Sequence, residues 1–260
     1  EIGYQSKKLE ELEGLSATEK ANMLFIVQDP YTSYYDAKVV RDFVALTQKL
    51  GFEPTILPFK PNGKAMHIKG FLTRFSKTAK TQAEFLNRVA KLNVPLVGVD
   101  PAIVLSYRDE YKEVLGDSRG DFHVLTAHEW LTNQLESNAL QSAVKNIAKS
   151  DRTFEWHLFP HCTESTFMPN SPKEWQHIFA QFGQTLNVEK VGCCGMAGVF
   201  GHEVQNQTMS KDIYDVSWGK KLQGKDPNHC LATGYSCRSQ VKRYEKAILK
   251  HPVQALLEVL

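Results

Sequence analysis

The first 161 residues of this 260-residue chain contain no cysteine, and all five of its cysteines lie in the remainder. Long apolar runs are also missing, since the longest, such as Met23–Val27 and Pro95–Val99, are far too short to cross a bilayer. We therefore expect no transmembrane segment. The formal net charge is only +2, so no strong field of one sign favours binding to nucleic acid or to an anionic membrane.

Other familiar signals are absent as well. The charged opening Glu1–Lys20 has none of the features of a secretory signal peptide, and no nucleophile elbow or phosphate-binding loop is present. Because the sequence opens without an initiator Met, we expect it to be part of a longer protein. An odd number of cysteines in a chain of this size favours thiolate ligation in a reducing compartment over a disulfide framework, so we expect a cytoplasmic location.

Short apolar segments alternate along the whole chain with segments whose apolar residues recur at helical spacing. This alternation predicts an α/β fold with parallel sheets that are flanked by helices. The expected strands are Met23–Val27, Pro54–Phe59, Pro95–Val99, Phe122–Thr126, Phe154–Phe159, Asn187–Val191 and Cys230–Thr233. The expected helices are Asp36–Leu50, His67–Leu92 with a break near Thr78, Ile103–Leu115, His128–Lys149, Lys173–Phe182, Val204–Lys221 and Ser236–Leu249.

The two halves of the sequence also resemble each other. The step from Pro30 to Pro61 equals the step from Cys162 to Cys193, and a glycine follows each second member two positions later. A later stretch corresponds with a two-residue insertion. We prefer duplication to the general self-similarity of βαβ proteins. The domains expected are an N-terminal extension or linker over 1–21, a degenerate cysteine-free lobe over 22–150 and a cysteine-containing lobe over 151–260.

Four cysteines follow the predicted strands of the second lobe. Loops that follow successive parallel strands meet at one edge of a sheet, so Cys162, Cys193, Cys194 and Cys237 are expected to gather there. Adjacent thiolates can face one soft metal or cluster. The spacings match neither zinc fingers nor ferredoxins. We interpret Cys230, inside its predicted strand, as a buried apolar side chain.

A resemblance to a known family rests on these cysteines. The segment Val191–Gly198, with one cysteine before it and another after it, resembles the cysteine-rich "CCG" domain of heterodisulfide reductase and of related iron–sulfur proteins. Together with His161–Glu164, Gly201–Glu203, Ala232–Lys242 and His251–Leu257, it is similar to the C-terminal end of large bacterial FAD and iron–sulfur D-2-hydroxyglutarate dehydrogenases. The resemblance covers nearly the whole chain from about Asn22.

The sequence departs from the family pattern at two places. The family motif ends in Cys-x-x-Cys, but Gly234 occupies the first position of that ending and only Cys237 remains. The first lobe has no cysteine. The expected cofactor is therefore a four-iron cluster or Zn²⁺ on four thiolates. An imidazole could complete the ligand shell, and the candidates are His161 and His202, which are equally plausible as hydrogen-bonding or surface residues.

The resemblance implies a role in an oxidoreductase. A flavin (FAD) elsewhere in the full-length protein would take a hydride from a D-2-hydroxyacid, and electrons would leave through iron–sulfur centres toward a quinone or carrier. The implied partners are flavin and ferredoxin-like domains of the same polypeptide, with a location in the cytoplasm or at the inner face of the membrane. The chain alone is expected to be inactive, and we expect no catalytic residue in it.

Two alternatives use the same thiols. A redox-inert structural zinc site could close the three loops in a docking domain. A thiol reductase that uses the Cys193–Cys194 pair is less favoured, because a disulfide between adjacent cysteines is strained.

Overall fold

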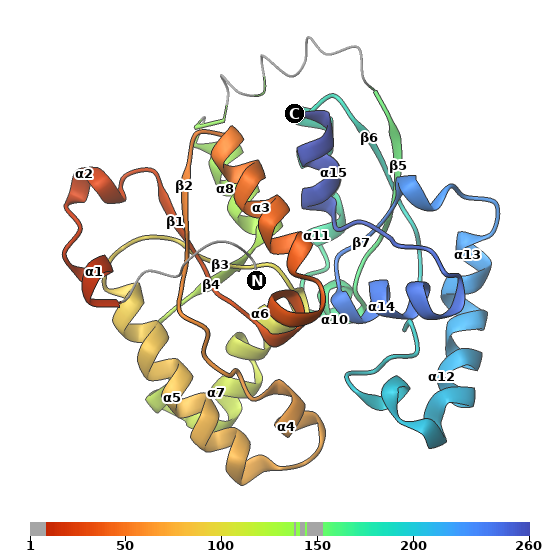
Figure 1. The fold of residues 1–260 in the computed structure, drawn as a ribbon, viewed down its shortest axis with the longest axis horizontal. Helices are drawn as coiled ribbons and strands as arrows, with labels where there is room; N and C mark the ends of the chain where they lie inside the picture. Colours follow the sequence, from red (N-terminus) through yellow and green to blue (C-terminus); the bar gives the residue numbers. More distant parts are fainter. Residues whose placement is uncertain (1–8, 138, 141–143, 145–152) are drawn as a thin grey trace. The chain divides into compact units, whose positions relative to one another are not determined.

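The computed structural model describes residues 9–137, 139–140, 144 and 153–260. Its chain divides into two compact units, Glu1–Trp130 and Leu131–Leu260. Each unit carries one parallel sheet flanked by helices, so the predicted α/β fold class is confirmed (Figure 1). The lobe boundary predicted between 150 and 151 lies outside the described residues, as do the end of the helix predicted over His128–Lys149 and the first eight residues of the predicted extension.

Unit 1 is built on four parallel strands in the order β2-β1-β3-β4. The two inner strands, β1 (Met23–Ile26) and β3 (Leu96–Gly98), are buried at every position, as expected for apolar segments covered on both faces. The outer strands are β2 (Glu53–Ile56) and β4 (Val124–Thr126). All four observed strands overlap the strands that the sequence predicted.

Helices connect and cover these strands. They are α3 (Ala37–Lys49), α4 (Lys64–Ile68), α5 (Leu72–Ala90), α6 (Pro101–Arg108), α7 (Glu110–Leu115) and α8 (Ala127–Glu136). The predicted break near Thr78 is wrong, because α5 runs through that residue and the chain bends earlier, at Gly70 with φ +76°. Two short helices, α1 (Leu9–Glu13) and α2 (Ala17–Lys20), fall in the predicted extension, and Leu9 and Leu12 are buried in the core of unit 1.

Unit 2 is built on three parallel strands in the order β6-β5-β7. They are β5 (Glu155–Phe159), β6 (Thr185–Val188) and β7 (Cys230–Ala232), with Lys250 bridging Leu231 on the free side of β7. The helices are α10 (Cys162–Phe167), α11 (Ser171–Gln181), α12 (Gln207–Tyr214), α13 (Lys220–Leu222), α14 (Tyr235–Tyr244) and α15 (Pro252–Val259).

Several elements of unit 2 differ from the sequence prediction, and helix α10 is one that was not predicted. Strand β6 begins and ends earlier than predicted, because the apolar residue Leu186 is the one buried in the sheet. Helix α14 ends at Tyr244 rather than Leu249, which frees the following residues to run beside β7. Helix α15 was not predicted, and it begins with His251 as its N-cap and a proline in its first turn.

The sheet of unit 2 is packed on both faces. On one face Phe159 lies with its ring centroid 5.2 Å from that of Trp218, and both belong to a buried cluster that includes Cys194 and Cys237. On the other face Trp156 lies 6.4 Å from Phe179 of α11. Figure 1 shows α12 and α13 on one side of this sheet and α11 on the other. None of the helices described is long and apolar enough to cross a membrane.

The strand registers of the two units correspond. The pair Met23–Glu53 in unit 1 has its counterpart in Glu155–Thr185 in unit 2, with the same separation along the chain. The pair Phe25–Leu96 corresponds to His157–Cys230, whose separation is two residues longer, as the predicted two-residue insertion requires. The order β2-β1-β3 therefore matches β6-β5-β7, which supports duplication over general self-similarity.

Candidate metal centre

The loops after the three strands of unit 2 carry the four predicted cysteines. Cys162 is the first residue of α10, directly after β5. Cys193 and Cys194 lie in the loop that follows β6, and Cys237 lies in the first turn of α14, after β7. All five cysteines are free thiols; Cys162 and Cys193 are partly exposed, whereas Cys194 and Cys237 are buried. The carboxyl edge of the sheet thus gathers four sulfurs.

These sulfurs contact one another in a row. The Cys193 sulfur has hydrogen bonds with the thiols of both Cys162 and Cys194, and the Cys194 thiol also contacts Cys237. Cys162 lies near enough to Cys237 for their charges to interact. The order of contacts is therefore Cys162–Cys193–Cys194–Cys237, with Cys193 between two donors.

The proton distribution in this row is uneven. The thiols of Cys162 and Cys194 donate to Cys193, and backbone N–H groups of Gly195 (3.3 Å) and Ala197 also donate to its sulfur. These four hydrogen bonds lower the pKa of Cys193 far below that of a free thiol, because they stabilise the thiolate. The same contacts raise the pKa of Cys162 and of Cys194, and burial adds to the rise. Among Cys162, Cys193 and Cys194, the Cys193 thiol is therefore the one that ionises most readily.

The loop that carries Cys193 and Cys194 is fixed from two sides. Gly195 adopts φ +81°, and Ser210 of α12 donates to its carbonyl at 2.7 Å. Gln240 of α14, fully buried, donates to the carbonyl of Cys194 at 3.0 Å and to Ser210 Oγ at 2.8 Å. Ser210 and Gln240 were not predicted from the sequence, since polar residues on a helix give no sign of which loop they reach.

His161 lies in the site but uses both ring nitrogens elsewhere. Its Nδ1 accepts from Thr163 N–H at 3.2 Å and caps α10, and its Nε2 is 3.2 Å from Ser236 Oγ. The ring fills the space above Gly234, where an added Cβ would lie 2.9 Å from His161 Cγ. An imidazole therefore takes the room beside the position at which the family pattern has its first cysteine.

His202 sits in the helical turn η3 (Phe200–His202), exposed to solvent. Its Nδ1 lies 3.0 Å from the guanidinium of Arg243. Partial desolvation and this positive charge lower the pKa of His202. Ligation by His161 or His202 stays a prediction.

Cys230 is separate from the row. It is the first residue of β7, is fully buried, and belongs to the apolar cluster of unit 2. Burial raises the pKa of its thiol to about 11, so it carries its proton. This placement agrees with the interpretation of Cys230 as a buried apolar side chain.

The chemistry of the donor set suits a soft metal. Four thiols without an oxygen ligand favour zinc or an iron–sulfur centre over a hard cation. Among the residues described, however, no three Cys, His, Asp or Glu side chains are arranged as the ligands of a single metal ion. The sulfurs touch one another instead, so metal binding would exchange thiol–thiol contacts for metal–sulfur bonds.

The corresponding edge of unit 1 carries no thiol. By the strand registers, Pro30 stands where Cys162 does, Pro61 and Asn62 where Cys193 and Cys194 do, and Ile103 where Cys237 does. Gly63 keeps the left-handed conformation of its counterpart, with φ +79°. The loop shape is thus conserved between the two units while the sulfurs are replaced.

A buried carboxyl pair occupies this edge of unit 1. Asp29, at the position of His161, accepts from the N–H groups of Tyr31 at 2.8 Å and Thr32 at 3.0 Å, and so caps its turn as His161 does. Asp100, at the position of Gly234, caps α6. Burial, and then the charge of Asp100, raise the pKa of Asp29 to about 6.

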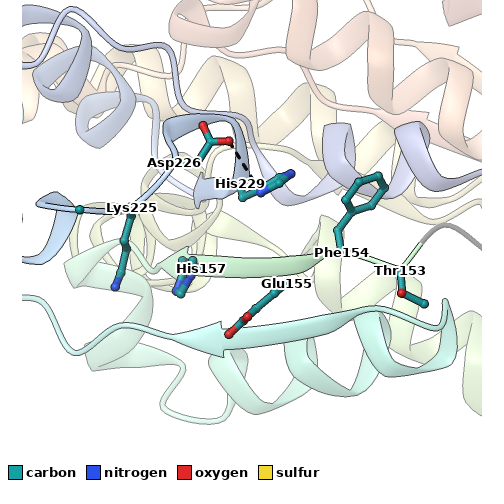
Figure 2. A pocket seen from close by; sticks show the side chains of 8 residues that line it. Thr153, Phe154, Glu155, His157, Lys225, Asp226 and His229 are labelled. Carbon is teal, nitrogen blue, oxygen red and sulfur yellow. Dashed lines mark ion pairs between the residues drawn. The ribbon is translucent and has the colours of Figure 1, made fainter.

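A cavity of about 510 Å³ opens at the opposite edge of the unit 2 sheet, beside the beginnings of β5 and β7. Figure 2 shows Lys225, His157 and His229 with Asp226 and Glu155 around it. Its basic side chains are matched by a carboxylate, since His157 Nδ1 (3.0 Å) and Lys225 Nζ (3.3 Å) both contact Glu189. The lining therefore favours neither anions nor cations.

The chain is similar in sequence to proteins named D-2-hydroxyglutarate dehydrogenase. The chain is 80% identical over 260 residues to D-2-hydroxyglutarate dehydrogenase of Haemophilus influenzae (strain ATCC 51907 / DSM 11121 / KW20 / Rd), and 56% identical over 261 residues to that of Escherichia coli K12. In both cases it covers 100% of its own length and 25% of the relative. The chain therefore spans about a quarter of the length of these relatives.

A more distant similarity extends to a second enzyme. The chain is 21% identical over 234 residues to one subunit of the anaerobic glycerol-3-phosphate dehydrogenase of Escherichia coli K12, and the match covers 88% of the chain and 57% of that subunit. No known protein-family model matches the chain, so membership of the cysteine-rich family stays a prediction. Its relatives are regions of D-2-hydroxyglutarate dehydrogenases and, more distantly, of this glycerol-3-phosphate dehydrogenase.

Proposed function

We propose that the chain is the iron–sulfur electron-transfer region of a flavin-dependent D-2-hydroxyacid dehydrogenase that acts on D-2-hydroxyglutarate. The single observation that carries the proposal is the row of thiols from Cys162 to Cys237, delivered by three loops to one sheet edge. The 80% identity to a protein of that name supports the substrate.

In this proposal Cys162, Cys193, Cys194 and Cys237 hold a four-iron cluster. When bound, such a cluster accepts and donates single electrons. Cys193 would be the ligand that ionises most readily, because hydrogen bonds from Cys162, Cys194 and backbone N–H groups lower the pKa of its thiol. Ligation by thiolates would release protons, which would make cluster uptake dependent on pH.

The remaining steps belong to the proposed full-length protein. A flavin in another domain takes the hydride from the substrate, a ferredoxin-like domain passes electrons on, and a quinone or soluble carrier receives them. The proposed location is the cytoplasm or the inner face of the membrane. The chain by itself is expected not to oxidise the acid.

The proposal is tested on the 260-residue chain purified without oxygen. Iron and sulfide of about four each per chain, with visible absorption that dithionite bleaches reversibly, would support it. A chain that holds no iron after reconstitution with ferrous iron and sulfide would refute it. Spectra and metal content are measured on the same sample.

Two variants give the matched comparison. Cys194→Ser removes a sulfur from the middle of the row and should abolish reversible bleaching. Cys230→Ala removes a buried thiol outside the row and should leave the iron content unchanged, because Cys230 contacts apolar residues. Equal loss of iron in both variants would contradict the assignment of ligands.

A structural zinc site is the second candidate. The burial of Cys194 and Cys237 favours it, because structural zinc sites use four closed thiolate or imidazole ligands. A sample with one zinc per chain, no iron and no response to dithionite would decide for this function. The chain would then close three loops for docking without carrying electrons.

A further inference from the structure

We propose that Glu164 and Thr233 are positioning residues that hold the Cys162 loop and the Cys237 loop at the separation that metal binding needs. This inference rests on the proposed metal site of unit 2. Neither side chain is offered as a ligand. Their role is to join the loop after β5 to the loop after β7 through a buried hydrogen-bond bridge.

The bridge consists of three connected hydrogen bonds. The backbone N–H of His161 donates to Thr233 Oγ1 at 2.9 Å, and Thr233 Oγ1 donates to the Glu164 carboxylate. The other carboxylate oxygen of Glu164 accepts from Ser171 Oγ of α11. Glu164, Ser171 and Thr233 are only 1–2% exposed. A buried carboxylate is costly unless it is hydrogen-bonded, so its bonds resist opening.

The bridge is close to the outer ligands of the row. Glu164 lies two residues after Cys162, in the first turn of the same helix. Thr233 lies four residues before Cys237, in the turn that leads from β7 into α14. Because both anchors are this near, a change in their separation moves Cys162 relative to Cys237. The inner pair, Cys193 and Cys194, is held separately by Gln240 and Ser210.

Unit 1 offers an internal comparison. It repeats the same sheet and loops without thiols, and by strand register Thr32 and Val99 occupy the positions of Glu164 and Thr233. Thr32 donates to Asp29 instead, and Val99 has no hydroxyl to donate. Unit 1 thus forms the same sheet and loops without this bridge, and the bridge occurs in unit 2, which carries the cysteines. That distribution favours a role in the thiol site over a role in forming the sheet.

The main test replaces Thr233 by Val, the residue at the corresponding position of unit 1. Wild type, Thr233→Val and Thr233→Ser are reconstituted with ferrous iron and sulfide in the absence of oxygen. The readouts are the half-life of the bound iron in excess EDTA, and the EPR spectrum of the reduced sample. We expect iron to leave Thr233→Val about ten times faster or more, the usual effect of losing a residue that orients ligands. Thr233→Ser should restore the wild-type half-life, since it keeps the hydroxyl.

The matched control is Thr47→Val in unit 1. Thr47 is also fully buried, and its hydroxyl donates to Val44 O within its own helix at 2.9 Å. This variant should lose a similar amount of stability without changing the iron half-life. A Thr233→Val protein with the wild-type half-life and EPR spectrum would overturn the inference. An equally fast loss of iron from Thr47→Val would also overturn the inference.

Glu164→Leu keeps the test decisive if Thr233→Val does not fold. It keeps a side chain of similar size but removes both acceptor oxygens, so Thr233 and Ser171 each lose this partner. A faster loss of iron from this variant supports the bridge, and an unchanged half-life overturns it. If wild type itself takes up no iron, the proposed electron-transfer function fails. If only the inference about the bridge fails, wild type still binds iron and all the variants lose it at the wild-type rate.

Discussion

The imidazole of His161 lies directly over the backbone of Gly234. A Cβ atom added to Gly234 would lie 2.9 Å from His161 Cγ and closer still to Cδ2, well inside van der Waals contact. The His161 ring is held there by Thr163 N–H on one nitrogen and by Ser236 Oγ on the other. Space rather than backbone conformation therefore requires glycine at 234, whose φ is −88°.

This contact predicts that Gly234→Ala displaces the His161 ring. The variant should lose about 1–3 kcal/mol of unfolding free energy, the usual cost of overpacking a filled site. The measurement is urea denaturation of the metal-free chain. Gly192→Ala is the control, because its added Cβ would meet Ser217 Oγ at an ordinary 3.5 Å. Equal stability of the two variants would show that the ring moves aside freely.

A stronger effect is expected at Gly195. Its φ is +81°, and an added Cβ would lie 3.0 Å from the carbonyl carbon of Ser210, with the carbonyl oxygen nearer. Backbone atoms give way less easily than a side chain, so Gly195→Ala should cost about 3 kcal/mol or more.

Gly183→Ala separates the two causes of that loss. Gly183 also has positive φ, at +67°, but nothing lies near its added Cβ. It should cost only the conformational penalty of about 1–2 kcal/mol. The same denaturation experiment compares them, and a Gly195→Ala loss no larger than that of Gly183→Ala would contradict the packing argument.

The sequence predicted much of this arrangement because its strands are short apolar segments and its cysteines follow them. The four thiols of the row could be named in advance, since loops after parallel strands meet at one edge. The bridge through Glu164 and Thr233 could not. Glu164 stands in a first helical turn, where an acidic residue is common for electrostatic reasons. Nothing in a lone threonine tells which carboxylate it meets 69 residues away.

Other failures have similar causes. Apolar residues at helical spacing over His67–Leu92 do not show where the chain bends. The bend lies at Gly70, which adopts a left-handed conformation. Helix α15 was missed because His251 is a rare N-cap. The buried pair Asp29 and Asp100 was not predicted, since only the strand order brings the two residues together.

Cys193 should react with alkylating agents differently from its neighbours. Its lowered pKa keeps the thiolate populated as pH falls, whereas an ordinary thiol loses about tenfold in thiolate per pH unit. In the metal-free chain the rate of iodoacetamide labelling at Cys193 should therefore stay nearly constant from pH 8 to pH 6. Peptide mass spectrometry measures it site by site.

Two controls accompany the labelling. Denatured chain should show the ordinary steep dependence at every cysteine, because the backbone donors from Gly195 and Ala197 are lost. Cys193→Ser should remove the pH-independent signal. A rate at Cys193 that rises tenfold per pH unit in the folded chain would argue against the thiolate.

The last prediction concerns the carboxyl group of Asp29. Its pKa is raised from 3.8 to about 6, first by burial and then by the charge of Asp100. Between these values the folded state holds a proton that the unfolded state releases, so stability falls as pH rises from about 4 to about 6. The shift corresponds to about 2–3 kcal/mol.

Asp29→Asn should remove this dependence, because an amide does not titrate and its oxygen can still accept from Tyr31 and Thr32 N–H. Unfolding free energies of both proteins are measured in urea from pH 4 to pH 7. Across that pH range the unfolding free energy of wild type should fall by about 2–3 kcal/mol relative to that of the variant. Asp121→Asn, at an exposed position, should keep the wild-type profile. A constant difference between wild type and Asp29→Asn would mean that Asp29 is ionised throughout and that its pKa is not raised.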